Sequence, residues 1–393
     1  MQIVSWFLII YGVLALVHIF GQILFAYLNY CKDSADEIIP DYDSPVSVIV
    51  PSYNEDPKVL NNSIKSILKQ NMKNLELIVI DDHSENFDEL YRKVYRKYEN
   101  DIRVKMIYSK RNQGKRDSQK MGFDIANGKF IITIDSDTVF HDSNSIAILI
   151  SRFSDPEIGA VTGDVRVENA RRNFLTRLIG YRYWNAFNQE RAAQSYFKSV
   201  ACCSGPFSAY RKSIIDNVKD EYVNEMFMGE KCTFGDDRHL TNLVLHEGYK
   251  VVYEYRALAY TYVPSTIKKY VKQQVRWNKS FYRELLWTIK NVHNQSLYLY
   301  FDMFSQLVLP FMLLIAIVTM IVQCVLTASL YLFWKYVIVL IIIAVIRSLY
   351  GIIRTNDIGF LMFILYGFIH ILFMIPVRLY ALCTINHTHW GTR

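Results

Sequence analysis

Two carboxylates stand two positions apart at the end of an apolar run. The run, Phe130–Ile134, is rich in β-branched residues and predicts a buried strand, and Asp135 and Asp137 follow it directly. If the chain is still extended there, both side chains share one face. Carboxylate oxygens are the ligands that Mg²⁺ and Mn²⁺ prefer, and such a cation can bind phosphate groups. The pair therefore predicts a divalent-metal site for a diphosphate.

Polar residues also follow two other apolar runs, Ser47–Val50 and Leu75–Ile80, which predict strands. Helical patterns at 57–70 and 115–127 separate the three runs. This alternation predicts an α/β fold with a parallel, doubly wound sheet, in which ligands bind beyond the carboxyl ends of the strands. No G-x-G-x-x-G follows the first run and no Walker loop is present, so the usual glycine-rich phosphate loops are not predicted.

Side chains at the strand ends must therefore recognise a nucleotide. Tyr53 can stack on a uracil, Glu55 lies in the same polar string, and Asp82 can accept a hydrogen bond from the ring N–H. The string Asn112–Arg116 opens a predicted helix, where backbone N–H groups and Lys115 favour an anion. Each feature alone also fits a turn or a helix cap. Their convergence predicts a nucleotide-sugar site.

A second string, Gln273–Trp277, lies in a basic, aromatic-rich stretch just before a long hydrophobic region. Apolar residues in 266–290 recur at helical spacing, which predicts a basic amphipathic helix on the inner leaflet; a solvated cytosolic helix is the alternative. The basic residues of this stretch are Lys268, Lys269, Lys272, Arg276, Lys279, Arg283 and Lys290. At a membrane edge, Arg276 and Trp277 can hold a sugar polymer at a pore.

Hydrophobic residues make up 51% of the 393 positions and concentrate in 3–30 and 297–385. Ile3–Leu28, Phe301–Leu326 and Leu330–Ile346 are each long enough to span a bilayer. The N-terminal block lacks the basic region and cleavage site of a signal peptide, so a retained anchor is predicted.

Two features of the apolar blocks leave alternatives open. His18 and Gln22 lie one turn apart, so they face a helix bundle or a polar channel, or form a tolerated polar stripe. The last block, Phe360–Ile385, is either re-entrant, interfacial or spanning. The residues that interrupt it are Gly367, His370, Pro376 and Arg378.

The basic residues also predict an orientation in the plasma membrane. Those of 32–296, with Arg347 and Arg354, should lie inside the cell, which places the N-terminus and a turn near residue 328 outside.

The six cysteines form no C-x-x-C pair and are expected as reduced thiols. The net charge of +7 fits a membrane surface or a phosphate-bearing substrate, and no nucleic-acid partner is predicted. The expected units are an N-terminal transmembrane helix (1–31), a cytosolic domain (32–264), interfacial amphipathic helices (265–296), a transmembrane pair (297–353) and a re-entrant, interfacial or transmembrane segment with the C-terminal tail (354–393).

In this order, the motifs resemble processive family-2 glycosyltransferases, which include hyaluronan, chitin and cellulose synthases. The strings that carry the resemblance are Pro51–Glu55, Asp81-Asp82, Asp135–Asp137, Gly235–Asp237 and Gln273–Trp277. Longer strings are similar to bacterial hyaluronan synthases: Asn112–Arg116, Asn185–Phe187, Glu190–Ser195, Cys203–Pro206, Gly235–Asn242, Arg276–Ser280 and Trp390–Arg393. A glucuronate–glucose capsule synthase is also similar, including near Phe227–Gly229. Bacterial hyaluronan synthases carry two helices before the catalytic domain, where this chain has room for one.

The resemblance implies a glycosyltransferase-A-type sheet and a membrane-embedded, inverting, processive enzyme that works as a monomer among membrane lipids. It would polymerise hyaluronan from UDP-glucuronate and UDP-N-acetylglucosamine with Mg²⁺ or Mn²⁺ and pass the nascent polysaccharide through the membrane. The alternatives are a glucuronate–glucose or chitin-type synthase, a non-processive transferase with a lipid acceptor, and a binder of nucleotide-sugar without chemistry.

Asp237 is the candidate base, because the neighbouring Asp236 would raise its pKa by like-charge repulsion; a helix cap is the alternative. By resemblance Asp137 is the metal ligand, with Asp135 beside it at the metal or the ribose. The expected catalytic group is Asp236, Asp237, Arg276 and Trp277. Donor binding is expected from Tyr53, Glu55, Asp82, Lys115, Asp135, Gln273, Arg276, Trp390 and Arg393. Acceptor binding is expected from Cys203, Ser204, Gly205, Trp277 and Asn278.

Overall fold

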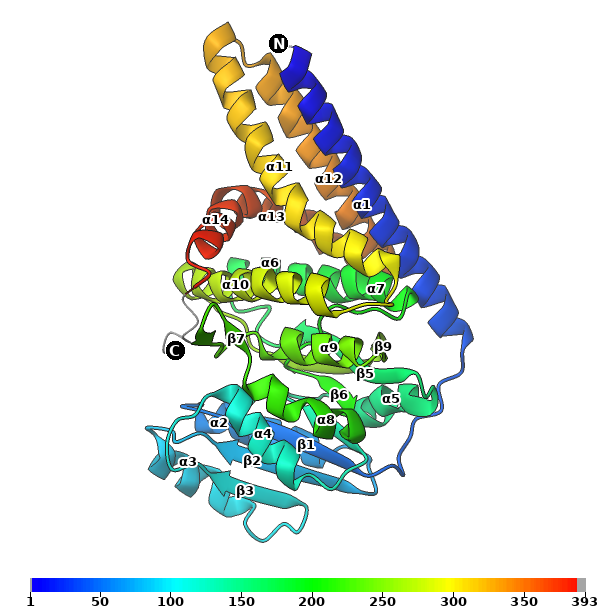
Figure 1. Ribbon diagram of the computed structural model, residues 1–393, viewed down its shortest axis with the longest axis vertical. Helices are drawn as coiled ribbons and strands as arrows, with labels where there is room; N and C mark the ends of the chain where they lie inside the picture. Colours follow the sequence, from blue (N-terminus) through cyan, green and yellow to red (C-terminus); the bar gives the residue numbers. More distant parts are fainter. Residues whose placement is uncertain (1, 387–393) are drawn as a thin grey trace.

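The computed structural model describes residues 2–386, in which a mixed β-sheet lies beneath a set of long apolar helices (Figure 1). The sheet has seven strands in the order β3-β2-β1-β4-β6-β5-β9. Its strands are β1 (Val46–Ser52), β2 (Leu75–Asp81), β3 (Val104–Tyr108), β4 (Phe130–Thr133), β5 (Ile158–Val167), β6 (Ser208–Arg211) and β9 (Lys250–Thr261). A separate hairpin pairs β7 (Met226–Phe227) with β8 (Glu230–Lys231).

The three strands expected from the sequence are central neighbours. β1 is buried along its whole length and pairs in parallel with β2, from Val46 opposite Leu75 to Ser52 opposite Asp81. It also pairs in parallel with β4. Their carboxyl ends therefore lie side by side, as predicted. β6 runs antiparallel to both β4 and β5, so the sheet is mixed and not purely parallel.

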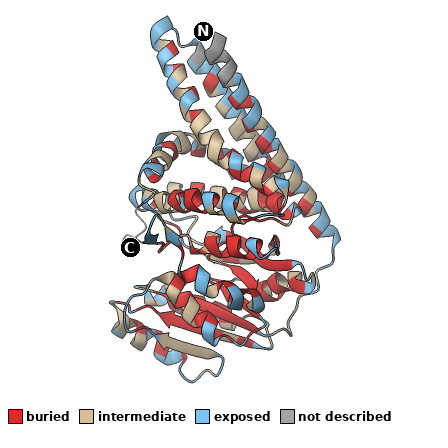
Figure 2. Ribbon diagram, viewed as in Figure 1, coloured by how far each residue is buried: buried red, intermediate tan, exposed pale blue. Residues whose placement is uncertain are grey.

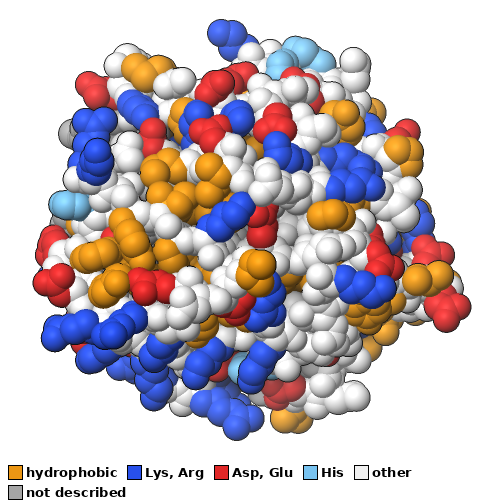
Figure 3. Space-filling view, turned by 90° about the horizontal axis from the view of Figure 1, so that it is seen from below, with side chains coloured by type: hydrophobic (Ala, Val, Ile, Leu, Met, Phe, Trp, Pro, Cys, Tyr) orange, Lys and Arg blue, Asp and Glu red, His pale blue; other side chains and the backbone are white. Residues whose placement is uncertain are grey.

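Helices cover the sheet and connect its strands. They are α2 (Pro57–Leu68), α3 (Phe87–Lys93), α4 (Lys115–Ile125), α5 (Ser145–Ser151), α8 (Lys212–Val223) and α9 (Asp236–His246). Between the sheet and the long helices lie α6 (Phe174–Asn185), a π-helical turn (Ala186–Arg191), α7 (Ala192–Tyr196) and α10 (Ile267–Asn291) (Figure 1). The face of the molecule opposite the long helices carries interspersed acidic and basic side chains, as expected of a surface in water (Figure 3).

Three long helices run side by side: α1 (Gln2–Ala35), α11 (Leu297–Thr327) and α12 (Tyr331–Thr355) (Figure 1). Exposed and intermediate residues predominate over buried ones in the described parts of their outer halves (Figure 2). Four segments are long and apolar enough to cross a membrane: Ile9–Ala35, Leu297–Thr327, Phe333–Thr355 and Ile358–Cys383. The third runs beyond the predicted end at Ile346. Arg354 is accommodated within it because its guanidinium lies over the ring of Tyr30, with 3.3 Å from Cζ to the ring centroid.

The polar side chains of α1 face the helix bundle. His18 Nε2 lies 2.9 Å from Asp302 Oδ1 on α11, and Gln22 Nε2 donates to the same oxygen over 3.2 Å. Gln194 Nε2 donates to Asp302 Oδ2 over 2.6 Å, and Gln306 Nε2 donates to it over 2.7 Å. All four contacts converge on one buried carboxylate, so the bundle alternative describes His18 and Gln22.

The fourth apolar segment is broken into short pieces, among them α13 (Phe363–Ile369) and α14 (Ile375–Cys383). In Figure 1 these helices lie across the base of the long bundle, above α10, and do not run along it. Tyr282 Oη of α10 donates to the carbonyl of Arg378 over 3.5 Å, and Arg378 Nη1 donates to the carbonyl of Gln306 over 2.9 Å. This arrangement supports the re-entrant or interfacial alternative, which stays a prediction.

A single helix, α10, occupies most of the region expected to hold interfacial helices. Lys268, Lys269 and Lys272 are exposed, as expected of its basic side. Its apolar residues Tyr270, Phe281 and Leu285 are nonetheless buried within the protein. The apolar side of α10 therefore packs between the sheet domain and α14, so its amphipathic pattern is explained by packing within the protein as well as by a bilayer surface.

Candidate active site

A cavity of about 840 Å³ opens beyond the carboxyl ends of β1, β2 and β4. Its walls come from the strand ends, the start of α9, the first half of α10 and the segment from α6 to α7. The cavity continues toward the membrane helices, where Met303, Gln306, Tyr366, His370 and Arg378 line it. One continuous space therefore joins the predicted donor site to the apolar helices.

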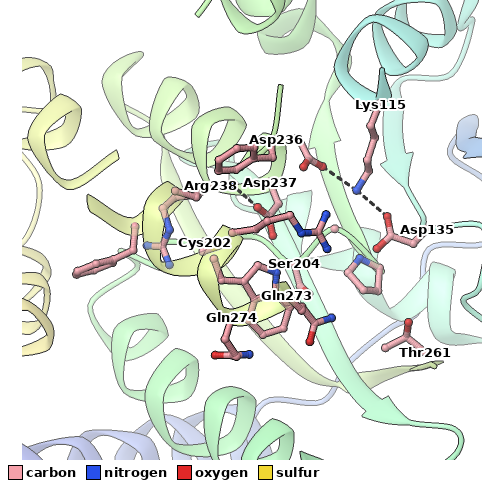
Figure 4. Close-up of a pocket in the computed structure, with 18 of the residues that line it drawn as sticks. Lys115, Asp135, Cys202, Ser204, Asp236, Asp237, Arg238, Thr261, Gln273 and Gln274 are labelled. Atoms are coloured by element: carbon pink, nitrogen blue, oxygen red, sulfur yellow. Dashed lines mark hydrogen bonds and ion pairs between the residues drawn. The ribbon is translucent and has the colours of Figure 1, made fainter. Parts of the chain in front are cut away.

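Lys115 joins the two acidic motifs of the cavity (Figure 4). Its Nζ lies 2.7 Å from Asp135 Oδ1 and 2.7 Å from Asp236 Oδ2. Burial would lower the pKa of Lys115, but the two carboxylates outweigh it and hold the pKa well above its ordinary value. A Cβ at Gly205 would stand 3.1 Å from Lys115 Nζ, so a larger residue there would crowd the ammonium group.

Asp237 lies in the first turn of α9, behind a glycine in the left-handed conformation. Gly235 has φ +85°, and a Cβ there would collide with Ser280 of α10. Burial raises the pKa of Asp237, and the neighbouring Asp236 raises it further. The like-charge effect expected from the sequence therefore operates, but burial is the larger cause. The result is a carboxylate suited to accept a proton near neutral pH.

Asp135 and Asp137 both line the cavity, but the chain between them is not extended. The Thr138 N–H donates to the carbonyl of Asp135 over 3.0 Å and closes a turn. Asp137 Oδ1 accepts a hydrogen bond from Thr261 Oγ1 over 3.1 Å. Two carboxylates on one wall provide the hard oxygen ligands that Mg²⁺ or Mn²⁺ requires, so the donor set fits such a cation.

The other residues expected at the donor lie at different depths. Tyr53 lines the cavity. Asp82 also lines it, but its oxygens accept the backbone N–H groups of Gln113 (2.9 Å) and Gly114 (2.7 Å). Those two N–H groups are therefore occupied by Asp82 and are not open to a phosphate, whereas anion binding at the first turn of α4 stays a prediction. Glu55 is not among the lining residues, because its Oε2 accepts from Ser136 Oγ over 2.7 Å behind the turn.

The string on α10 faces the cavity. Gln273, Arg276, Trp277 and Asn278 all line it. Trp277 is 46% exposed, which leaves its ring free to stack on a sugar. Its ring lies 6.4 Å from the ring of Tyr183 of α6, measured between centroids.

Two of the three residues of the expected acceptor loop line the cavity. Ser204 and Gly205 line the cavity, whereas Cys203 is fully buried in the core and does not. Its neighbour Cys202 lines the cavity instead. The Cys203 side chain packs into the hydrophobic core instead of facing the cavity. Burial raises the pKa of Cys202 to about 12, which excludes a thiolate nucleophile at neutral pH.

Comparison with known proteins agrees with this geometry. Residues 47–219 match the family model described as glycosyl transferase family 2. The chain is 35% identical over 384 residues to a hyaluronan synthase of Streptococcus pyogenes, covering 96% of this chain and 91% of that protein. The chain belongs to glycosyltransferase family 2. It is also 35% identical over 350 residues to an N-acetylglucosaminyltransferase of Rhizobium meliloti, covering 88% of this glycosyltransferase and 81% of the relative.

The fold of the glycosyltransferase has a solved counterpart. A mannosyltransferase from Pyrobaculum calidifontis, solved in complex with GDP-Man and Mn²⁺, is similar over 97% of this chain and 99% of that one. The TM-score is 0.65 at 17% sequence identity. The similarity confirms the glycosyltransferase-A-type sheet. The enzyme is thus a membrane-associated family-2 glycosyltransferase of the processive type with four long apolar segments.

Several lining residues of the glycosyltransferase were not predicted as site residues. Phe187, Glu190, Arg191 and Gln194 form one wall of the cavity. Their spacing of three and four positions gives one face of a helix, which is the signal that could have found them. Arg182 lines the same wall and pairs with Glu190, with 3.0 Å from Nη1 to Oε1. Trp390 and Arg393, expected at the donor, lie outside the described residues.

A second cluster of charged residues lies behind the base and not in the cavity. Glu225, His239 and Glu284 are buried close together and are the one group of three potential metal ligands found among residues 2–386. His239 Nδ1 lies 3.2 Å from Glu284 Oε2, and Asn242 Nδ2 donates to the same oxygen over 2.8 Å. The guanidinium of Arg116 lies 2.5 Å from Glu225 Oε2. An arginine beside a carboxylate makes this cluster an ion-pair network that anchors α9.

Proposed function

We propose that this glycosyltransferase is a hyaluronan synthase that polymerises UDP-glucuronate and UDP-N-acetylglucosamine and passes the product across the plasma membrane. One observation carries the proposal. A single cavity holds the half-buried Asp237, the exposed ring of Trp277 and a path that continues between α11 and α13–α14. A non-processive transferase needs the first of these features but not the other two.

The catalytic step follows from the position of Asp237. Its carboxylate takes the proton from a hydroxyl of the acceptor sugar that is stacked on Trp277. The hydroxyl oxygen forms a bond to the anomeric carbon, and the bond from that carbon to the diphosphate oxygen breaks with inversion of configuration. Lys115 and Arg276 offset charge on the departing UDP.

Asp137, with Asp135, would hold a Mg²⁺ or Mn²⁺ ion. The bound ion supplies positive charge to the diphosphate as it leaves. Tyr53, Asp82 and Gln273 are proposed to hold the nucleotide, and Ser204, Gly205 and Asn278 to hold the acceptor. The predicted roles of Trp390 and Arg393 at the diphosphate remain part of this proposal.

Purified protein incubated with pairs of UDP-sugars tests the product directly. Hyaluronan synthesis requires UDP-glucuronate and UDP-N-acetylglucosamine together and yields a polymer that hyaluronan lyase digests. A polymer from UDP-N-acetylglucosamine alone would replace the proposal by a chitin-type synthase, the candidate favoured by the N-acetylglucosaminyltransferase relative. A polymer from UDP-glucuronate and UDP-glucose would indicate the capsule-type enzyme.

The assignment of the base has its own test. Asp237→Asn should abolish synthesis while UDP binding persists, because the carboxamide keeps the shape of the side chain but accepts no proton. Asp220→Asn is the matched control, since that carboxylate is 76% exposed on α8. Synthesis by Asp237→Asn at the parent rate would show that another group is the base.

A further inference from the structure

Two arginines that line the cavity, Arg191 and Arg238, have no carboxylate partner among residues 2–386. Neither guanidinium lies within 4.0 Å of a carboxylate oxygen there. Other cations of the same cavity differ, because Lys115 contacts two carboxylates and Arg182 pairs with Glu190. Burying a guanidinium partly without an anion costs free energy. A negatively charged ligand that pairs with these two groups would offset that cost.

The two arginines come from different elements, and each lies against an aromatic ring of the cavity region around Trp277. Arg191 Cζ lies 4.2 Å from the ring centroid of Phe187, whose ring is 6.4 Å from Tyr183, the neighbour of Trp277. Arg238 Cζ lies 5.4 Å from the ring centroid of Phe281, one helical turn after Trp277 on α10. Each guanidinium therefore lies against an aromatic ring in the part of the cavity that also contains Trp277.

The arginines also stand apart from the donor end of the cavity. In Figure 4 the Arg238 side chain lies beside Cys202, on the other side of Asp237 from Lys115 and Asp135. Arg191 Nε donates to the carbonyl of Cys202 over 3.0 Å, and its Nη1 donates to the carbonyl of Ala186 over 3.3 Å. These bonds fix the guanidinium of Arg191 and leave its Nη2 without an acceptor among the described residues.

We propose that Arg191 and Arg238 form a carboxylate subsite that binds the uronate of the terminal acceptor sugar. The inference rests on the proposed function and names the residues that would recognise one of its two sugars. Guanidinium groups suit this task because they donate two parallel hydrogen bonds to a carboxylate and stay charged at every physiological pH. The subsite is filled when the chain ends in glucuronate and unfilled when it ends in N-acetylglucosamine.

Measuring the two half-reactions of polymerisation separately distinguishes uronate binding by these arginines from a purely structural role. Short acceptors ending in glucuronate are extended by UDP-N-acetylglucosamine, and acceptors ending in N-acetylglucosamine are extended by UDP-glucuronate. For Arg238→Gln and for Arg191→Gln, kcat/KM for the glucuronate-ended acceptor should fall roughly ten- to a hundredfold, the loss expected of a charged hydrogen bond. The other half-reaction should change by no more than about twofold, within the effect of an ordinary surface substitution. Arg238→Lys should restore part of the loss, and Arg172→Gln, at an exposed position before α6, is the control.

Each outcome decides for or against the subsite. An equal loss in both half-reactions would overturn it, because a disturbed Asp237 or a misfolded wall slows both alike. Unchanged kinetics in both would also overturn it. If the parent enzyme extends acceptors only with UDP-N-acetylglucosamine, the proposed function itself fails and the subsite with it. UDP binding by each variant, measured in parallel, verifies that the variant is folded.

Discussion

At the scale of single residues, one ammonium group connects donor chemistry with base chemistry. Lys115 contacts Asp135, a proposed metal ligand, and Asp236, the neighbour of the base. Burial would raise the pKa of Asp236, but Lys115 outweighs it and lowers the pKa, so Asp236 stays charged beside Asp237. That charge is one of the two causes that raise the pKa of Asp237.

Replacing Asp236 by Asn should therefore move the pH profile. The base acts deprotonated, so kcat/KM is lost as pH falls through the pKa of Asp237, which burial and Asp236 raise. Without the second charge this pKa drops, and the acidic limb of the profile shifts to lower pH. The maximal rate should fall roughly ten- to a hundredfold, because Lys115 loses a charged hydrogen bond. UDP release measured from pH 4 to 9 checks this, and an acidic limb that stays in place or moves upward would contradict it.

The exposed ring of Trp277 leads to a second prediction. Trp277→Ala should lower chain elongation roughly ten- to a hundredfold, since a buried aromatic contact of about 1.5–3 kcal/mol is lost. Slow hydrolysis of the UDP-sugar by water should persist, because the donor side is unchanged. Trp277→Phe should retain part of the elongation. Equal loss of elongation and hydrolysis would show that Trp277 serves the donor and not the acceptor.

At the scale of elements, α10 connects the motifs. Its first half presents Gln273 and Trp277 to the cavity, and its second half carries Glu284, which accepts hydrogen bonds from α9. The position of Asp237 at the start of α9 therefore depends on a helix that also contacts α14. Burial opposes the charge of Glu284, but His239 and Arg116 outweigh it and lower the pKa of Glu284 to about 2.

Glu284→Gln should destabilise the protein by about 3 kcal/mol, because breaking a buried ion pair strands its partners. The sign of the pH dependence follows from the lowered pKa. The stabilisation is fully present above the ordinary pKa of 4.5 and is lost as pH falls toward about 2. Thermal unfolding in detergent should show a lower Tm than the parent at pH 7 and a smaller difference near pH 3. Glu247→Gln, at an exposed position after α9, is the control, and an equal effect of the two variants would refute the argument.

At the scale of the whole molecule, the cavity runs from the sheet domain toward the long apolar helices. The sheet domain lies at one end, the turn between α11 and α12 lies at the other, and the cavity continues from the first toward the second (Figure 1). If the sheet domain lies inside the cell, as predicted from the distribution of basic residues, this direction is the one in which a polymer would be exported.

Cysteine accessibility in intact cells tests the orientation. Ser329→Cys, at the exposed turn after α11, should react with a membrane-impermeant maleimide. Glu247→Cys on the sheet domain should react only after the cells are opened. The parent protein, with the exposed thiols of Cys31 and Cys383 on the inner side, should remain unlabelled in intact cells. Labelling of Glu247→Cys in intact cells would reverse the orientation.

The sequence alone determined the features that depend on local pattern. The β-branched runs predicted β1, β2 and β4 to within a few residues, and their polar ends predicted where the cavity lies. Long apolar runs predicted the membrane helices, because a bilayer demands length and hydrophobicity that no other element needs. β6 was not predicted, since a four-residue strand has too little pattern of its own and forms by pairing with β4 and β5.

Only the tertiary structure decided which side chains share the site. Lys115 meets Asp236 across 121 positions of the chain, and Arg191, Arg238 and Trp277 reach one cavity from separate elements. The cavity receives Cys202 and not Cys203 because the Cys203 side chain packs into the hydrophobic core. Local sequence records how a segment folds, whereas charge pairing and burial depend on what the fold places beside it.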